Sequence, residues 1–349
     1  MSEHQRATPE TIGSDRIAVD AMGGDFAPEA VVQGALLAAS RDGIPTLLVG
    51  DEEAIHAAND SLVDHPLISV RHASEVVAMG AEPASSVRRM KDSSIVRAAE
   101  AVRDGDAIAL LSAGNTGAAM AASLLRIGRI KGVTRPTIAV PFPILGSTTR
   151  CSLVDAGANP DATPEMLVQF AQLGAVYTRS RYGVARPRVA ILTIGEEAGK
   201  GNALVKEAVK LFEDGDWALS CGADYVGNME GNDLMSGAAD VLVCDGFTGN
   251  VVLKSLEGAM EIALDAIRAA LVSTPDAVAT APVLDPILTP LFNILNPKLI
   301  GAAMLCGTRE VSVISHGSSN ADTIANAIRT TSELANSTVV QDFRDVFSK

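Results

Sequence analysis

The stretch IAVDAMGGDFAPEAVVQGAL, residues 17–36, carries the pattern that decides the fold. A short apolar run comes first, and a glycine-rich loop follows it. Pro28 and Glu29 then open a helical pattern, because proline in the first helical turn lacks only an N–H group that has no intrahelical partner there. Strand, loop and helix in this order make one βα unit.

The same unit recurs along the chain. Short apolar runs predict strands at residues 17–20, 46–50, 67–71, 107–112, 137–141, 151–155, 188–194, 241–244 and 311–315. Helical patterns follow most of them, for example at residues 84–103 and 163–178, and signals for antiparallel hairpins are nearly absent. We therefore predict an α/β fold that is doubly wound around a mostly parallel sheet.

Composition bounds the class of protein. The chain has 349 residues, of which 47% are apolar, enough to bury the core of one large domain or of two lobes that share a sheet. Its formal net charge of -14 disfavours binding to nucleic acid and strong general attraction to anionic lipid, because both surfaces would repel the chain.

The first residues and the cysteines bear on location. Residues 1–15 are polar and lack the apolar core of a signal peptide, so we predict a disordered tail in front of one domain at 16–349. No CxxC pair occurs among Cys151, Cys221, Cys244 and Cys306, which predicts reduced thiols and a cytoplasmic protein. No uncharged apolar run reaches the ~18 residues that a membrane span requires.

One apolar excursion, at about residues 277–308, breaks the pattern. Asp285 and Lys298 are its only charges, and prolines interrupt it at positions 282, 286, 290 and 297. Prolines this dense predict that no single long helix forms. Two interpretations stay open: a buried or dimer-interface hairpin of short helices, and an apolar tip that touches a membrane or a lipid chain.

Six predicted strand ends run into loops rich in Gly, Asn, Ser and Asp. They are DAMGGD (20–25), SAGNTG (112–117), DAGAN (155–159), IGEEAGKGN (194–202), CDGFTGN (244–250) and SHGSSN (315–320). In an open parallel sheet such loops gather at the carboxyl ends of the strands, where ligands bind. Glycine allows close backbone approach, and the helix N-termini that follow offer free N–H groups, so phosphate is the natural ligand. The aspartates could equally cap helices or order the loops.

Familiar catalytic fingerprints are missing. The sequence has no GxGxxG after a strand, no GxSxG and no zinc-type spacing of histidines, and the loop around Lys200 is one residue too short for a Walker motif. We therefore expect neither a metal nor a cofactor. Lys200 lies between glycines, and His316 is the one histidine in a ligand-like loop. A solvated lysine and a hydrogen-bonded structural histidine are the alternatives.

Read together, the loops resemble those of the bacterial phosphate acyltransferase (PlsX) family. The matching segments include SAGNTGAAMAASLLRIGRIKGVTRP, LVDAGANPDATPEMLVQFAQLGAVY, IGEEAGKGNALVKEA, VCDGFTGNVVLKSLEG and SHGSSNADTIANAIR, and they span about residues 17–329. The resemblance implies a fold similar to phosphotransacetylases and the isocitrate-dehydrogenase-like group. It implies transfer of a long-chain acyl group from the thioester of acyl-carrier protein to inorganic phosphate, which gives acyl phosphate for phospholipid synthesis.

The resemblance also implies partners and residue roles. The partners are a second copy of the chain in a homodimer, a peripherally contacted membrane and a downstream glycerol-3-phosphate acyltransferase. Lys200 would bind phosphate or handle a proton, and Asn250 would donate a hydrogen bond to the developing oxyanion. The residues expected to hold phosphate and the phosphopantetheine arm are Asp20, Gly23, Gly24, Asp25, Ser112, Gly114, Asn115, Thr116, Gly117, Asp155, Asn159, Glu196, Asn202, Asp245, Gly246, Thr248, Gly249, His316, Ser318 and Asn320.

The excursion departs from the family pattern. Family members usually carry an acidic-aromatic segment that leads to a GGAPLLG-like motif, whereas NPKLIGAAMLCGT lacks the aromatic lead-in, so how the acyl chain or the membrane is met stays open. Three other interpretations remain: a phosphotransacetylase acting on short-chain acyl-CoA, a non-catalytic scaffold that docks carrier protein at the membrane, and a nucleotide-dependent dehydrogenase, which lacks its fingerprint loop.

Carrier protein is acidic, so an acidic enzyme needs a local basic surface to dock it. Positive charge is concentrated in two short segments. Their cations are Arg88, Arg89, Lys91, Arg126, Arg129, Lys131 and Arg135. Solvated helix faces or dimer contacts are the alternative.

Overall fold

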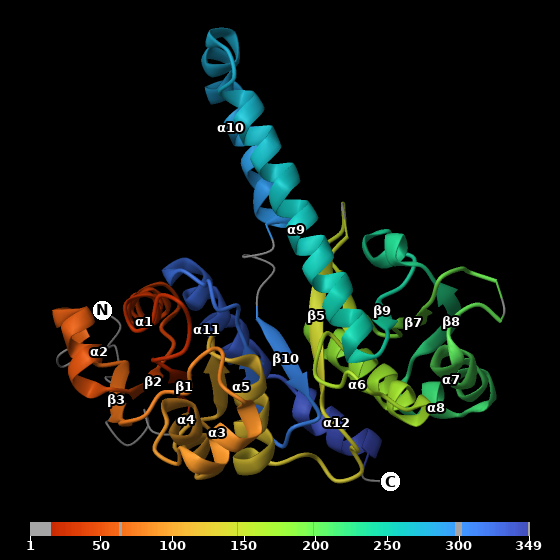
Figure 1. Ribbon diagram of the computed structural model, residues 1–349, viewed down its shortest axis with the longest axis horizontal. Coiled ribbons are helices and arrows are strands. Elements are labelled where there is room, and N and C mark those ends of the chain that lie inside the picture. Colours follow the sequence, from red (N-terminus) through yellow and green to blue (C-terminus); the bar gives the residue numbers. More distant parts are fainter. Residues whose placement is uncertain (1–14, 63–64, 145, 198, 297–301, 348–349) are drawn as a thin grey trace, which may run out of the picture. The chain divides into compact units, whose positions relative to one another are not determined.

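The computed structural model describes residues 15–62, 65–144, 146–197, 199–296 and 302–347. The tail predicted at residues 1–15 lies outside this range except for Asp15. The chain divides into two compact units (Figure 1). Unit 1 comprises residues 1–136 and 302–349, and unit 2 comprises residues 137–301.

The strands of unit 1 follow the order β3-β2-β1-β4-β11-β10. They are β1 (Ile17–Asp20), β2 (Thr46–Gly50), β3 (Ile68–His72), β4 (Ala109–Ser112), β10 (Ala303–Cys306) and β11 (Val311–Ile314). All neighbours pair in parallel except β10 and β11, which are antiparallel. β1, β2, β4 and β11 are buried along their whole length, which is why they read as continuous apolar runs.

Two groups of helices accompany the sheet of unit 1. The helices are α1 (Glu29–Asp42), α2 (Glu52–Ala58), α3 (Pro83–Arg89), α4 (Ser94–Arg103), α5 (Thr116–Ala122), α11 (Ala321–Ala335) and α12 (Val339–Phe347), with short turns η1 (Asp60–Leu62) and η2 (Ser123–Ile127). α1 packs against α11, and α3, α4 and α5 form a second group (Figure 1). Gly34 allows the first contact, because a Cβ atom there would lie 2.5 Å from Cβ of Ile324.

Unit 2 repeats the plan with its own strands, in the order β5-β6-β9-β7-β8. They are β5 (Thr137–Pro143), β6 (Arg150–Val154), β7 (Arg188–Leu192), β8 (Asp224–Met229) and β9 (Val241–Val243). β6, β9, β7 and β8 pair in parallel, and β5 pairs antiparallel with β6. The helices are α6 (Pro164–Tyr182), α7 (Ala203–Asp214), α8 (Trp217–Cys221), α9 (Gly246–Leu271) and α10 (Pro275–Leu295), with the turn η3 (Gly231–Met235).

The predicted fold class is confirmed, since both units have mostly parallel strands flanked by helices. Two antiparallel pairs and two strands, β8 and β10, were not predicted. β8 is only partly buried and contains Gly227 and Asn228, so it shows no apolar run. β10 lies within the stretch that was assigned to the apolar excursion.

The single helix predicted at residues 84–103 is wrong, because the structure has two helices, α3 and α4, separated by a turn. The turn arises because Asp92 bonds elsewhere. Its carboxylate accepts hydrogen bonds from Oγ of Ser74 at 2.6 Å and from Nε of Arg97 at 2.7 Å. Short polar side chains of this kind compete with helical backbone bonding.

The prediction that prolines prevent one long helix in the excursion is also wrong. α10 is continuous through Pro282, Pro286 and Pro290. The prolines lie four residues apart, so they share one exposed face, and water can reach the carbonyl groups that lose their N–H partners. The opposite face lies against α9 in a hairpin (Figure 1).

No residue of α10 is buried within the chain, so the buried version of the hairpin is excluded. By length and composition alone α10 would be able to cross a membrane, although the sequence pattern predicted no such run. Exposed apolar side chains are frequent on both helices of the hairpin and in the turn that joins them: Ile262, Ile267, Val272, Val278, Val283, Ile287, Leu291 and Ile294.

Candidate active site

In unit 1, three of the predicted loops leave one edge of the sheet. The register places Val19 of β1 beside Leu111 of β4, and Ile314 of β11 beside Ser112 of β4. The three strands are parallel, so the loops 20–25, 112–117 and 315–320 begin side by side. All three carry residues expected from the sequence to bind substrate.

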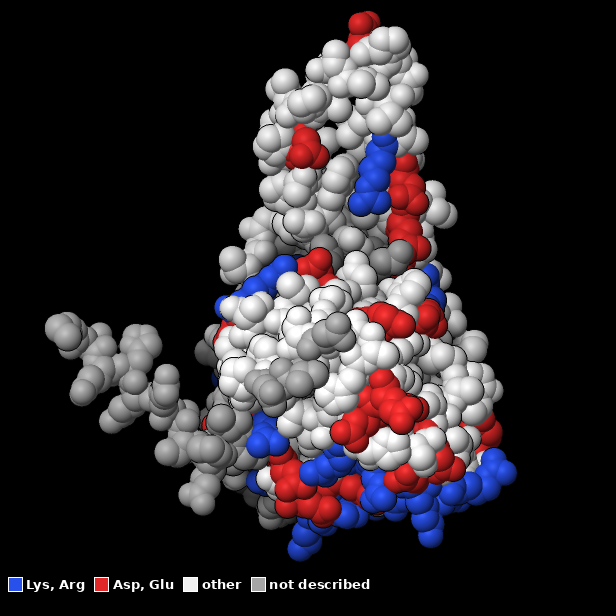
Figure 2. All heavy atoms as spheres, turned by 90° about the vertical axis from the view of Figure 1, so that its left-hand side faces the viewer, with Lys and Arg blue, Asp and Glu red and all other residues white. Residues whose placement is uncertain are grey.

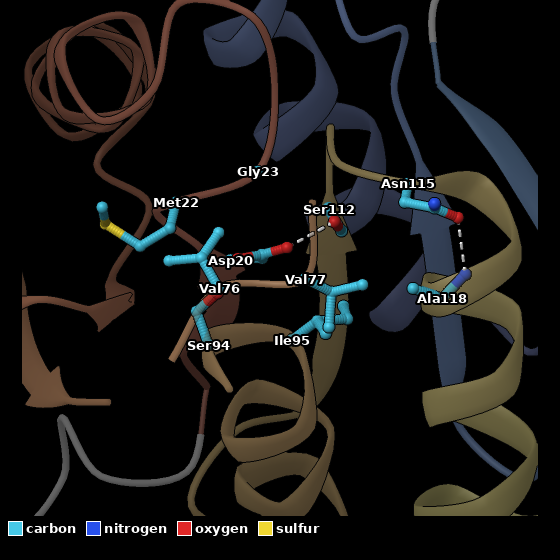
Figure 3. A pocket seen from close by; sticks show the side chains of 10 residues that line it. All are labelled: Asp20, Met22, Gly23, Val76, Val77, Ser94, Ile95, Ser112, Asn115 and Ala118. Carbon is cyan, nitrogen blue, oxygen red and sulfur yellow. Dashed lines mark hydrogen bonds between the residues drawn. The ribbon is translucent and has the colours of Figure 1, made fainter. Parts of the chain in front are cut away.

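Asp20 lies beneath these loops and is only 4% exposed. Its Oδ2 atom accepts a hydrogen bond from Oγ of Ser112 at 2.7 Å, and Ser112 Oγ accepts one from the N–H of Gly114 at 3.1 Å. Figure 3 shows the Asp20 and Ser112 side chains pointing toward one another in a small pocket. Among the described residues no hydrogen bond reaches the buried Oδ1 atom of Asp20.

The environment of Asp20 changes its acidity. Burial raises the pKa of Asp20, and hydrogen bonds from Ser94, Ser112 and the backbone of Met22 only partly oppose the shift. Through its bond with Ser112, Asp20 orders the loops from below.

Glycines let the first two loops approach each other. A Cβ atom on Gly23 would lie 2.6 Å from Oδ2 of Asp20 and 2.7 Å from the backbone nitrogen of Gly114, so no larger residue fits. The third loop joins them, because the N–H of Asp25 donates to the carbonyl of Gly317 at 2.8 Å. Gly24, between these contacts, has a φ of 119°.

Asn115 uses both ends of its amide for structure. Oδ1 accepts from the N–H of Ala118 at 3.0 Å and caps α5, while Nδ2 donates to the carbonyl of Met79 at 2.7 Å. Thr116 and Gly117 follow in the first turn of α5, and Thr116 is exposed. The segment at 76–82 therefore belongs to the site. This segment was not predicted from the sequence, in which Gly80 just ahead of Pro83 was its only signal.

The third loop is held by short-range hydrogen bonds. The N–H of Ser318 donates to Nδ1 of His316 at 3.2 Å, and Ser318 Oγ lies 2.8 Å from the same atom. Asn320 caps α11 by accepting bonds from the N–H and the hydroxyl of Thr323, each at 3.0 Å. His316 is exposed at this edge and is placed to meet a ligand.

Unit 2 gathers the other three loops in the same way. Val243 of β9 lies beside Val154 of β6 and beside Ile191 of β7, and all three strands are parallel. The loops 155–159, 194–202 and 244–250 therefore leave neighbouring strand ends, with the loop after β9 in the middle. Lys200 and Asn250 lie on adjacent loops of this set.

Asp155 orders the first of these loops from within. It is 0% exposed, and its Oδ1 atom accepts from the N–H groups of Ile138 and Ala158 at 3.0 Å each. Its Oδ2 atom accepts from the backbone N–H of Asn159 at 2.6 Å and from Nδ2 of the same residue at 2.9 Å. The loop-ordering role considered for the strand-end aspartates fits Asp155.

The loops after β6 and β9 interlock. The N–H of Gly246 donates to the carbonyl of Asn159 at 2.8 Å, and a Cβ atom on Gly249 would lie 1.8 Å from the carbonyl oxygen of Asp155. Asp245 caps α9 by accepting from the N–H of Thr248 at 2.8 Å and from its hydroxyl at 2.7 Å. The hydroxyl of Thr248 and the carboxylate of Asp245 are therefore already hydrogen-bonded to each other.

Asn250 differs from the other loop residues because its amide has no structural task. It lies in the first turn of α9 and is exposed. A Cβ atom on Gly157 would lie 3.5 Å from Oδ1 of Asn250, so the amide rests beside a glycine backbone. In the part of the chain that the structure describes, no hydrogen bond engages this amide, which leaves two N–H donors for a ligand.

Lys200 lies at the tip of the loop after β7. Its side chain is 49% exposed, and Nζ is 3.8 Å from a carboxylate oxygen of Glu197, a weak contact in water. Nδ2 of Asn228, which the sequence analysis missed, donates to the carbonyl of Glu197 at 3.1 Å and fixes the turn. Asn202 caps α7 by accepting from the N–H of Val205 at 2.9 Å, and Glu196 is exposed.

The chemistry available here is that of charge and hydrogen bonding. Burial raises the pKa of the Cys244 thiol well above its usual value and that of Cys151 to about 12, so neither supplies a thiolate nucleophile. All four cysteines are buried, and none forms a disulfide in the described chain. No group of three or more metal-binding side chains gathers among the described residues. A cation, a free amide and glycine backbones suit an anion and a developing oxyanion.

Solved structures share this fold. The EutD phosphotransacetylase from Staphylococcus aureus is 16% identical, with a TM-score of 0.58 over 93% of this chain and 96% of that chain. A phosphotransacetylase from Streptococcus pyogenes is 14% identical, with a TM-score of 0.58 over 94% and 99%. The predicted phosphotransacetylase-like fold is confirmed.

Closer relatives extend over nearly the whole chain. The phosphate acyltransferase of Pelotomaculum thermopropionicum is 43% identical over 329 residues, 94% of both proteins. That of Myxococcus xanthus is 45% identical over 316 residues, 90% of this chain and 88% of the relative. The family model described as "Fatty acid synthesis protein" matches residues 15–342. The chain therefore belongs to the fatty acid synthesis protein family, whose relatives carry the name phosphate acyltransferase, and the predicted enzyme class of acyltransferase is confirmed.

Proposed function

We propose that this chain transfers a long-chain acyl group from the thioester of acyl-carrier protein to inorganic phosphate and releases acyl phosphate for phospholipid synthesis. One observation carries the proposal: a free amide, Asn250, and an exposed cation, Lys200, follow neighbouring parallel strands of unit 2. Each belongs to a glycine-rich loop at the same edge of the sheet. Family membership supplies the reaction class.

The proposed reaction begins when an oxygen of hydrogen phosphate attacks the carbonyl carbon of the thioester. The carbonyl oxygen becomes an oxyanion, and the amide of Asn250 donates a hydrogen bond to it. The C–S bond then breaks, and the thiolate takes up the proton that phosphate loses. The products are acyl phosphate and the free thiol of the carrier. A thiol with a pKa of about 8.5 leaves readily, so little acid catalysis is needed.

Lys200 has the complementary task in this proposal. Its ammonium group binds the phosphate dianion and holds an oxygen toward the thioester, at the expense of the weak contact with Glu197. Positioning of this kind contributes on the order of 7–11 kcal/mol to a reaction between two separate molecules. Exposed His316 and Thr116, on the loops of unit 1, are proposed to bind substrate.

Phosphate-dependent release of thiol from acyl-carrier protein tests the proposal. The purified chain is given long-chain acyl-carrier protein with and without phosphate, and acyl phosphate is trapped as the hydroxamate. Thiol and hydroxamate should appear together and only with phosphate. Acetyl-CoA run in parallel identifies a short-chain phosphotransacetylase, and a chain inactive with both donors would be the scaffold.

We further propose a homodimer in the cytoplasm that contacts the membrane peripherally. The supporting observation is the α9–α10 hairpin, on which Val283 and Ile287 are 70% and 67% exposed. A face this apolar suits a second copy of the chain, and the part that the copy leaves uncovered suits a membrane surface. The downstream glycerol-3-phosphate acyltransferase is proposed as the consumer of acyl phosphate.

A further inference from the structure

The end of α3 carries a compact group of cations, Arg88, Arg89 and Lys91, called here the α3 patch. All three are exposed. Arg89 donates to Oγ of Ser85 at 3.0 Å, which leaves its charge unneutralised. In the described ranges no carboxylate lies within ion-pair distance of any of the three. The three cations therefore form no ion pair in the described chain, although Arg88 interacts electrostatically with Glu82, and they stand on a chain whose net charge is -14.

The α3 patch lies close to the candidate site. α3 begins at Pro83, whose ring would be 2.5 Å from a Cβ atom on Gly117 of the second loop. Just before it, the carbonyl groups of Met79 and Ala81 accept hydrogen bonds from the Asn115 amide, at 2.7 and 3.2 Å. A helix of this length spans about 10 Å, so the cations lie roughly that far from the loops.

The other basic segment lies elsewhere. Arg129 forms a β-bridge with Thr308, which precedes β11, whereas the SHGSSN loop follows the end of β11. The segment at 129–135 is therefore at the opposite edge of the unit 1 sheet from the site loops. Arg126 is also neutralised, with Nε 3.3 Å from a carboxylate oxygen of Glu100. Figure 2 shows Lys and Arg gathered along the lower edge of the molecule. Exposed positive charge alone therefore does not distinguish the two basic segments, whereas their distance from the site loops does.

The surface beside the loops of unit 1 is apolar in part. Val76 is 41% exposed and Met79 is 49% exposed. A Cβ atom on Gly317 of the third loop would lie 2.9 Å from the terminal methyl of Met79, so this residue borders the site itself. Exposed apolar groups flanked by unpaired cations match an acidic protein surface that carries a few apolar side chains.

We propose that the α3 patch is the docking surface for the acidic protein that delivers the acyl thioester. This inference rests on the proposed function. The partner's acidic face binds Arg88, Arg89 and Lys91, and its flexible thioester arm passes over Val76 and Met79 toward the loops of unit 1. Docking by charge raises the rate of encounter, so it should weaken with salt.

Charge reversal at Arg88 and Arg89 tests the proposal, with a matched control at the other segment. Arg88→Glu with Arg89→Glu changes the net charge by the same amount as Lys131→Glu with Arg135→Glu, and all four residues are exposed. For each variant kcat/KM is measured with acyl-carrier protein and with an uncharged acyl N-acetylcysteamine thioester. Carrier binding is titrated separately at low and high salt.

The first variant should lose about tenfold or more in kcat/KM with the carrier and keep its activity with the small thioester. Its salt dependence of binding should flatten, while the control variant stays close to wild type. Equal losses of kcat/KM in the two variants, or equal losses with the two donors, would show that the α3 patch is not the docking surface. Failure of the wild type to release thiol from acyl-carrier protein with phosphate would instead contradict the proposed function, and the binding titration would still measure docking.

Discussion

Oδ2 of Asp20 lies 2.7 Å from Oγ of Ser112, although the two residues are 92 positions apart in the chain. Asp20 ends β1 and Ser112 ends β4, so the bond joins two neighbouring strand ends under the loops. Ser112 in turn fixes the loop after β4, because its hydroxyl accepts a hydrogen bond from the N–H of Gly114. The glycine loops of unit 1 are thus held in place by a carboxyl group that is only 4% exposed.

Removing either partner should destabilise the fold. Asp20→Ala leaves a buried hydroxyl without its acceptor, and Ser112→Ala removes one of the donors to a buried carboxyl, so each should cost about 1–3 kcal/mol of unfolding free energy. The double variant should cost less than the sum, because the two residues share one bond. Urea unfolding measures all three. Asp25→Ala, at an exposed residue, is the control and should shift stability by no more than about 0.5 kcal/mol. Additive costs would show that the pair is not coupled.

The raised pKa of Asp20 predicts how stability changes with pH. Burial favours the protonated form in the folded chain, so the stabilisation from this proton is complete below the ordinary value of 3.8 and is lost as pH rises through the folded pKa. Asp20→Asn cannot ionise. The stability of the variant relative to wild type should therefore increase with pH across this window and then stay constant. A relative stability that falls or stays flat from pH 4 upward would contradict the raised pKa.

Gly249 should tolerate no side chain. A Cβ atom there would lie 1.8 Å from the Asp155 carbonyl oxygen, so Gly249→Ala should force the two loops apart and cost about 3 kcal/mol or more. Gly258, on the same helix, has no atom within 4 Å of such a Cβ, and Gly258→Ala should be neutral or stabilising by up to about 1 kcal/mol. Thermal unfolding of both variants shows whether the loss of stability comes from the close contact at Gly249 or from a general effect of alanine on α9. Similar behaviour of the two would show that the loops do not interlock.

Asn250→Ala should lower kcat by about 10²–10³-fold, because one donor to the oxyanion is lost. Unfolding free energy should hardly change, since the amide is exposed and has no hydrogen bond within the described chain. Lys200→Ala should instead raise KM for phosphate about tenfold or more, the value of a hydrogen bond to a charged group. Thiol release at varied phosphate gives both constants. Activities within a few-fold of wild type in both variants would remove these two residues from the site.

The exposed apolar side chains of α10 should govern dimerisation and membrane binding. Val283→Asp with Ile287→Asp places charge on an apolar face, so it should weaken the dimer in sedimentation equilibrium and reduce flotation with lipid vesicles. Activity with a small thioester should persist, because neither residue is near the loops. A variant that dimerises and floats like wild type would show that this face has no partner.

The fold was predictable where a strand is buried on both faces. β1, β2 and β4 read as short apolar runs followed by helical patterns, and their ends were placed within two residues. β8 was not predicted because it is half-exposed and its polar residues interrupt the apolar run that marks a buried strand. α10 escaped because the rule that proline breaks a helix weakens where three prolines share one solvated face.

The site was predictable as a set of loops, but not as a division of tasks. Gly, Asn and Asp look alike in all six loops, whereas the structure separates those that build from those that face outward. Asp155 and Asn115 turned out to hold backbone groups, and Asp20 the hydroxyl of Ser112, with partners on distant strands and segments. Asn250 and Lys200 remain outward-facing. Such long-range hydrogen bonds leave no trace in local sequence.

The fate of labelled phosphate tests the central claim most directly. Purified chain is mixed with long-chain acyl-carrier protein and phosphate in which all oxygens are ¹⁸O, and the acyl product is analysed by mass spectrometry. Direct attack by phosphate predicts acyl phosphate that retains every labelled oxygen, formed in step with free thiol. Unlabelled fatty acid as the product, released at a rate independent of phosphate, would contradict the account.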